Sequence, residues 1–175
     1  MERSLDEILV EQCAPTLVGI KPASLFRCRA DGGRCPAEAV ARTAPRMIFH
    51  LGDCWRDGER LHDLFPDLPF YQVPGNCDFR PGEPAERLVF VEDFRILLCH
   101  GHTYGVKQSL LTAGFAAEEQ NLDAFLFGHT HRPLVDRRGK TFFLNPGSIG
   151  DSRRPSYGLL TVTGGKLDVS THLLE

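Results

Sequence analysis

The stretch RMIFHLGD, residues 46–53, has the pattern of a buried β-strand that ends in a glycine and a carboxylate. Three further stretches repeat the pattern of an apolar run followed by polar residues: PFYQVPGNCD (69–78), ERLVFVEDFRILLCHGH (86–102, a hairpin) and LDAFLFGHTH (122–131). Helical periodicity separates them at residues 56–65 and 106–120. Strands that alternate with helices predict a mixed α/β fold.

Polar side chains stand at the ends of these predicted strands. They are Asp53, Asn76, His100, His129 and His131. Ligands bind at the carboxyl ends of strands in open α/β sheets, so residues far apart in the sequence can converge there. One carboxylate, one amide oxygen and three imidazoles suit Mn²⁺, Fe²⁺, Co²⁺, Ni²⁺ or Zn²⁺. Two such ions about 4 Å apart can clamp a phosphate ester and activate a water, with Asp53 as the carboxylate bridge.

The flanking segments extend the α/β pattern. Residues 36–44 are predicted as a helix with proline at its first position, and residues 134–148 and 156–174 as hairpin-like pairs of strands. Residues 4–13 have apolar residues at helical spacing, which predicts a short amphipathic helix, and residues 24–28 (SLFRC) are predicted as a short strand.

Composition and charge narrow the class of protein. The 175 residues carry a net charge of -3 at pH 7, which indicates no broad basic surface for nucleic acid. No apolar run approaches the ~20 residues that span a bilayer, so we expect no membrane partner and a cytoplasmic location. The 6 cysteines form no C-x-x-C pair and are expected to be free thiols.

Five motifs stand in order along the chain: HLGD, GNCDF, CHGH, FGHTH and LNPGS. Together they resemble the calcineurin-type metallophosphoesterases, specifically the small bacterial YfcE-like phosphodiesterases, over residues 46–150. The resemblance implies an α/β/β/α sandwich, in which two mixed β-sheets are flanked by helices, with a dinuclear metal site at one edge. It also implies a hydrolase that acts on a small phosphodiester through a metal-activated water, with Mn²⁺ as the expected ion.

The resemblance implies a role for each metal ligand. Asp53 bridges the two ions, and Asn76, His100 and His129 complete the shell of the second ion. His131 binds the first ion. The other ligands of the first ion come from an Asp-x-His motif that follows the first strand in the family.

Two further residues are candidates for catalysis. Cys77 stands where larger relatives carry a histidine that assists the leaving group, and His102 lines the site. Simpler interpretations exist for single residues. Asp53 alone is typical of a turn, and Cys77 alone is typical of a small buried hydrophobic residue. The two histidines of GHTH could be one core and one surface residue on alternating sides of a strand.

The chain departs from the family at its N-terminus, because it has no Asp-x-His motif there. Residues 32–53 fit the usual helix-then-strand span, so counting back from HLGD places the expected motif on RADGG, residues 29–33. Ala30 and Gly32 then take the two ligand positions. If one residue is deleted, Asp31 takes the position of the aspartate and the histidine is still missing.

Residues 5–28 look instead like the opening of an unrelated bacterial protein family. We therefore predict an atypical segment at 1–30, from a fusion or a replaced first strand, and a metallophosphoesterase domain at 31–175. The first metal shell would be incomplete, which lowers its affinity for an ion. The alternative function is a weak or inactive pseudo-enzyme that acts as a protein-interaction scaffold, for which the retromer subunit of this fold is a precedent. Self-association as a homo-oligomer is left open, and the acidic charge argues against a DNA-processing nuclease.

Overall fold

The protein folds around two five-stranded mixed β-sheets, as a computed structural model describes it for residues 6–11, 36–80, 82–151 and 153–174. The first sheet has, in spatial order, β10 (Lys166–Leu173), β9 (Ser156–Thr163), β1 (Asp6–Glu11), β2 (Met47–His50) and β3 (Phe70–Gln72). The second sheet has, in order, β4 (Glu86–Val91), β5 (Phe94–Cys99), β6 (Ala124–Leu126), β8 (Thr141–Pro146) and β7 (Pro133–Arg138).

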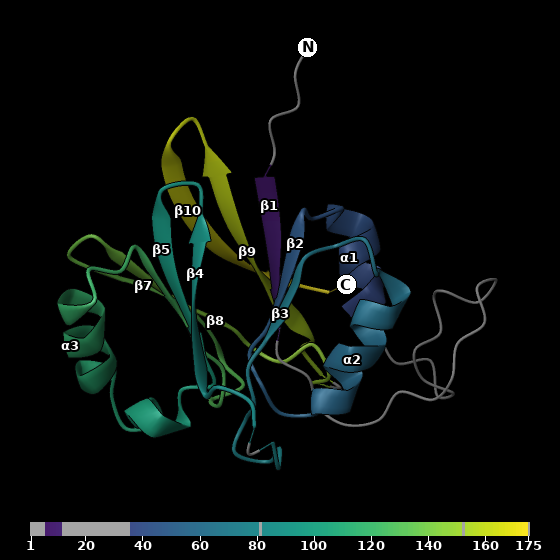
Figure 1. Cartoon of the computed structure of the whole chain (residues 1–175), viewed down its shortest axis with the longest axis horizontal. Helices are drawn as coiled ribbons and strands as arrows, with labels where there is room; N and C mark the ends of the chain where they lie inside the picture. Colours follow the sequence, from purple (N-terminus) through teal and green to yellow (C-terminus); the bar gives the residue numbers. More distant parts are fainter. Residues whose placement is uncertain (1–5, 12–35, 81, 152, 175) are drawn as a thin grey trace.

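Helices cover the outer face of each sheet (Figure 1). α1 (Pro36–Thr43) and α2 (Trp55–Leu64) lie on one flank, and α3 (Leu111–Glu119), preceded by the short 3₁₀ helix η2 (His102–Tyr104), lies on the other. The layers therefore run helix, sheet, sheet, helix. This is the sandwich of two mixed sheets that the sequence predicts.

The core follows the same layers. Phe49, Leu126 and Leu160 belong to a buried cluster formed by strands of both sheets. A second cluster packs Ile48 against residues of α1 and α2, and a third packs Phe125 against α3. Successive residues of β2 thus point to opposite faces, as the period of a strand requires, and both faces are buried.

The N-terminal segment corrects one prediction. Residues 6–11 form a strand, not the helix expected at 4–13. β1 pairs in parallel with β2, where Leu9 is the partner of Ile48, and antiparallel with β9, where Leu9 is the partner of Leu159. A strand with neighbours on both sides has its backbone hydrogen bonds satisfied by the sheet, which overrides weak helical spacing.

β1 also supplies the first strand of the parallel run. The predicted strand at 24–28 and the RADGG stretch lie outside the described residues. The sequence that follows β1 directly is Gln12, Cys13 and Ala14, which is again no Asp-x-His. The domain boundary placed after residue 30 stays a prediction. β1 comes from the predicted atypical segment, residues 1–30, and it belongs to the first sheet.

Most other elements lie where the sequence predicts them. α1, α2 and α3 fall within a residue or two of the predicted helices, except that α3 begins at Leu111 and not at residue 106. The stretch 122–131 differs, because β6 ends at Leu126 and the two histidines that follow lie in a bend.

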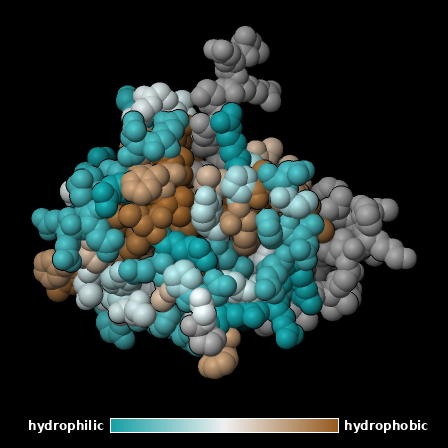
Figure 2. Space-filling model, viewed as in Figure 1, coloured by the Kyte–Doolittle hydropathy of each residue, from teal (hydrophilic) through white to brown (hydrophobic). Residues whose placement is uncertain are grey.

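Two surface features complete the fold. No helix in the described part of the chain is long and apolar enough to cross a membrane. On the face shown in Figure 2, apolar side chains gather around β4 and β5. Leu88 and Phe90 of the edge strand β4 are 40% and 59% exposed.

Candidate metal centre

The loops that follow β2, β3, β5 and β6 bring the predicted ligands together. Asp53 follows β2, Asn76 follows β3, His100 follows β5 directly, and His129 and His131 follow β6. All five come from the carboxyl ends of strands, as the sequence predicts. Contacts between them join residues up to 78 positions apart, such as Asp53 and His131, whose Oδ2 and Nε2 atoms are 3.7 Å apart.

Unusual backbone conformations make this convergence geometrically feasible. Asp53 has φ 58°, and the glycine before it has φ 89°, so the chain turns sharply at the end of β2. His129 and His131 have φ 65° and 58°. Non-glycine residues in the left-handed region are uncommon and concentrate at functional sites. Residues two apart share one face of a regular strand, so the interpretation that put the two histidines of GHTH on alternating sides was wrong; they follow the end of β6, and the Nε2 atom of His131 lies 3.7 Å from Asp53.

His100 is the centre of the cluster. Its side chain is fully buried, and its Nδ1 atom lies 2.8 Å from the carbonyl oxygen of Leu51. Because a carbonyl only accepts hydrogen bonds, Nδ1 carries the proton and donates it, which leaves a lone pair on Nε2. Burial lowers the pKa of His100, so the ring is neutral at pH 7 and its contact with Asp53 is not an ion pair.

Two acceptor oxygens and a ring nitrogen of His129 face the lone pair on the Nε2 atom of His100. The Oδ1 atom of Asn76 lies 3.0 Å away, the Nδ1 atom of His129 lies 3.2 Å away, and the Oδ2 atom of Asp53 lies 3.5 Å away. Burial, with a smaller effect of His100, lowers the pKa of His129 to about 4, so this ring is neutral too. Acceptor atoms that face one another repel unless a proton or a cation lies between them.

The donor set fits one divalent ion. Ligand atoms bound at about 2.1 Å around a tetrahedral ion lie about 3.4 Å apart, close to the separations around His100. The four donors are one carboxylate, one amide oxygen and two neutral imidazoles, which suit the transition ions better than Mg²⁺ or Ca²⁺. As the side chains stand, no three His, Cys, Asp or Glu residues in the described ranges form a group that could hold an ion, so binding requires small side-chain movements.

The remaining predicted residues have mixed outcomes. Cys77 is exposed, and its backbone N–H donates to Oδ1 of Asp53 at 3.2 Å. The charge of Asp53 raises the pKa of the Cys77 thiol, which therefore keeps its proton at neutral pH. The ring of His102 lies 5.4 Å from that of His100 between centroids, so His102 does border the site. Asp31 lies outside the described residues.

Two residues that the sequence did not single out hold the loops in place. Asp78 accepts hydrogen bonds from the backbone N–H of Trp55 and of Gly75, both at 2.9 Å, and so ties the start of α2 to the loop after β3. The buried side chain of Asn145 donates to the Gly128 carbonyl at 2.6 Å. Both residues belong to quoted motifs, GNCDF and LNPGS, but a single sequence gives no sign that their side chains bridge two loops.

His50 is a buried histidine beside the site, and its protonation predicts a dependence of stability on pH. Its Nδ1 atom accepts the N–H of Gly52 at 3.4 Å, while Nε2 finds no hydrogen-bond partner among the described residues. Burial lowers the pKa of His50 from 6.5 to about 4. The unfolded chain therefore binds this proton first, so stability is complete above pH 6.5 and falls as the pH drops from 6.5 towards 4, by about 3 kcal/mol.

We expect His50→Gln to flatten that part of the stability curve. Urea midpoints measured between pH 4 and 7 should fall less steeply for His50→Gln than for the wild type. The exposed His62 serves as a control, and His62→Gln should follow the wild-type curve. Parallel curves for all three proteins would contradict the prediction, because His100 and His129 contribute equally to each of them.

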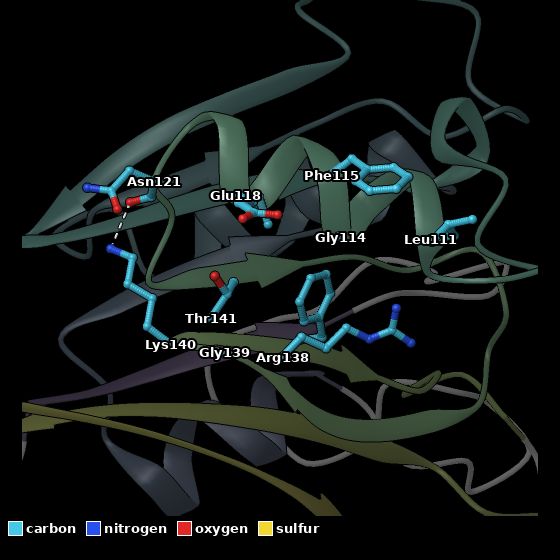
Figure 3. A pocket seen from close by; sticks show the side chains of 11 residues that line it. Leu111, Gly114, Phe115, Glu118, Asn121, Arg138, Gly139, Lys140 and Thr141 are labelled. Carbon is cyan, nitrogen blue, oxygen red and sulfur yellow. Dashed lines mark hydrogen bonds between the residues drawn. The ribbon is translucent and has the colours of Figure 1, made fainter.

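A separate cavity of about 450 Å³ lies between α3 and the turn that joins β7 to β8 (Figure 3). Its cations are already engaged, since Arg138 donates to the Leu110 carbonyl and Lys140 pairs with Asp123 at 2.9 Å. None of the converging histidines lines this cavity. We therefore place the chemistry at the strand ends and not in this cavity.

Comparisons with known proteins show the family of the chain. A model of the calcineurin-like phosphoesterase superfamily domain matches residues 31–165. The chain is 38% identical over 121 residues to the probable metallophosphoesterase YsnB of Bacillus subtilis, covering 66% of this chain and 68% of that protein. It is 34% identical over 149 residues to the phosphodiesterase YfcE of Escherichia coli, covering 70% of this chain and 76% of that protein.

Solved structures are similar in fold. A predicted phosphoesterase from Streptococcus pneumoniae superposes with a TM-score of 0.70 at 22% identity, covering 98% of this chain and 91% of the other. Vacuolar protein sorting 29 from Cryptosporidium parvum superposes with a TM-score of 0.67 at 20% identity, covering 97% and 98%. At these identities the likeness concerns the fold alone.

Proposed function

We propose that this protein hydrolyses phosphodiesters with divalent ions held at the strand ends, because the chain belongs to the calcineurin-like phosphoesterase superfamily. The observation that supports this best is the convergence of Asp53, Asn76 and His129 on the Nε2 lone pair of His100. A cation placed among the side-chain oxygens of Asp53 and Asn76 and the lone pair of His100 attracts all three, and this attraction replaces their mutual repulsion.

The two metal shells differ in completeness. Asp53, Asn76, His100 and His129 form a full set of four for one ion. Asp53 and His131 form only part of the shell of the first ion, because the sequence contains no Asp-x-His. Bound ions would supply Lewis acidity and an activated water. We therefore expect one tightly held ion and one that exchanges readily, with Mn²⁺ as the preferred metal.

The protein's own groups prepare the site for that chemistry. The N–H of Cys77 fixes the carboxylate of Asp53, and the Leu51 carbonyl fixes the tautomer of His100. The Cys77 thiol, with its raised pKa, is suited to donate a hydrogen bond to the departing oxygen and not to act as a nucleophile. His102 borders the space that the phosphate would occupy.

Hydrolysis of bis-p-nitrophenyl phosphate tests the proposal. We expect turnover that depends on added Mn²⁺ and disappears when a chelator is added. p-Nitrophenyl phosphate, a monoester, should react more slowly than the diester. His129→Ala should reduce the rate to that of the chelated wild type, because it removes one of the four donors. A wild-type rate equal to the chelated rate under all tested ions would overturn the proposal.

A second function, as a protein-interaction scaffold, is favoured by two observations. The missing Asp-x-His weakens the first metal shell, and Leu88 and Phe90 expose apolar surface on an edge strand (Figure 2). Metal analysis and turnover, both measured in protein equilibrated with Mn²⁺, separate the two functions. Two ions per chain together with turnover favour the enzyme, whereas one ion or none without turnover favours the scaffold.

A further inference from the structure

A second cavity adjoins the candidate metal centre. It has a volume of about 490 Å³ and lies between the first turns of α2 and the loop that follows β3. Cys77 is part of its wall, and Cys77 is next in sequence to Asn76 and hydrogen-bonded to Asp53. A group bound in this cavity therefore lies beside the proposed ligands, where a substituent of the phosphodiester would extend. The volume falls in the range of small-ligand pockets.

Aromatic rings line this cavity. The side chain of Phe79 is 92% exposed, at the tip of the loop. The guanidinium of Arg80, the next residue, lies over the indole of Trp55, 5.3 Å from the ring centroid. A guanidinium stacked on one ring can receive a second flat ring on its other face. An exposed phenylalanine beside it offers a platform of the kind on which nucleobases stack.

The charges of the cavity favour an anion. Arg56, Arg60 and Arg80 all line it. The acidic residues in its wall are engaged elsewhere, since Asp57 is buried and pairs with Arg60 at 3.2 Å. Asp78 accepts two backbone N–H groups.

Two of the arginines stay accessible to a ligand. Arg80 reaches Glu59 only at 3.8 Å. Arg56 is exposed and makes no ion pair within the described residues. These two guanidinium groups can hold a phosphate in the fork geometry that arginine favours.

We infer that this cavity binds the nucleotide portion of the substrate, with the base against Phe79 and the Arg80–Trp55 stack, and a phosphate held by Arg56 and Arg80. The inference rests on the proposed function, because it makes the substrate a small phosphodiester that carries a nucleotide. Binding can nevertheless be measured without any turnover.

The chain has 1 tryptophan, Trp55, whose fluorescence reports directly on this cavity. We expect adenosine 5′-monophosphate to change that fluorescence saturably in the protein as purified. Adenosine, which lacks the phosphate, and ribose 5-phosphate, which lacks the base, should each bind about tenfold more weakly. Arg56→Gln should weaken the binding of adenosine 5′-monophosphate to a similar extent, whereas Arg137→Gln on β7 should not.

Phe79→Ala provides the sharpest comparison, because so exposed a ring contributes little to folding. We expect about tenfold weaker binding of adenosine 5′-monophosphate in Phe79→Ala, and wild-type binding in Phe115→Ala, whose ring is exposed on α3. No saturable signal in the wild type, or equal affinities for the two phenylalanine variants, would overturn the inference. A lack of nucleotide binding would leave the hydrolysis of bis-p-nitrophenyl phosphate unchanged. The binding assay therefore tests the nucleotide site, and the hydrolysis assay tests the proposed function.

Discussion

Asp53→Asn is expected to lower kcat/KM for bis-p-nitrophenyl phosphate about 10³-fold, with little change in the free energy of unfolding. The Oδ2 atom of Asp53 lies 3.5 Å from His100 and 3.7 Å from His131, so its charge serves both proposed ions. Asparagine has the same shape, tolerates the φ of 58° and still accepts the N–H of Cys77. The substitution therefore removes the charge and little else.

A matched variant isolates the effect of that charge. Asp67 is exposed, in the turn before β3, and Asp67→Asn should retain wild-type kinetics. Urea unfolding of both variants shows whether the fold is preserved, and metal analysis shows whether an ion has been lost. A loss of activity below tenfold for Asp53→Asn, with unchanged metal content, would show that Asp53 does not bridge metal ions.

The strand ends were predictable because each motif combines two local signals. An apolar run of four to six residues predicts a buried strand, and the glycine after it predicts a sharp turn. In HLGD, GNCDF and FGHTH the polar residue follows such a turn. The topology of a parallel sheet brings Asp53 and Asn76 together, because they follow the paired strands β2 and β3, whereas His129 follows β6 of the second sheet and meets them only because the two sheets pack face to face.

The first strand was not predictable in the same way. Ile8, Leu9 and Val10 form an apolar run too short to separate a strand from a helical turn. Its pairing with β2 and β9 is set by residues about 40 and 150 positions away, which no local pattern contains. The count back from HLGD to RADGG stays a prediction, because residues 29–33 lie outside the described ranges; the structure adds only that β1, the strand beside β2, ends at Glu11.

Close approaches between loops also escape the sequence. His129 and His131, two positions apart, would share one face of a regular strand, but both follow the end of β6 and have left-handed φ angles that no strand pattern predicts. The bridging roles of Asp78 and Asn145 depend likewise on which loops meet in space. The cavity beside α2 combines a helix with a loop from another strand, so no pattern in the sequence joins Arg80 to Arg56 and Arg60, which stand one turn apart on α2.

Gly75→Ala is expected to reduce the free energy of unfolding by about 2 kcal/mol and to abolish most of the activity. A Cβ atom at Gly75 would overlap both the Oδ1 atom and the backbone nitrogen of Asp53, and a Cβ atom at Gly52 would lie 2.6 Å from the backbone nitrogen of Gly75. Because the obstacle is backbone, no side-chain rotation relieves the clash. The loops after β2 and β3 must move apart, and with them Asp53 and Asn76.

Gly82→Ala is the control for this prediction, since a Cβ at Gly82 meets nothing within 4 Å. Its urea midpoint and kcat/KM should equal those of the wild type. For Gly75→Ala we expect the activity to fall by more than the unfolded fraction explains, because the folded molecules also lose the spacing between the two ligands. Identical behaviour of the two alanine variants would contradict the close packing of these loops. It would also remove the main structural reason why Asp53 and Asn76 face the same ion.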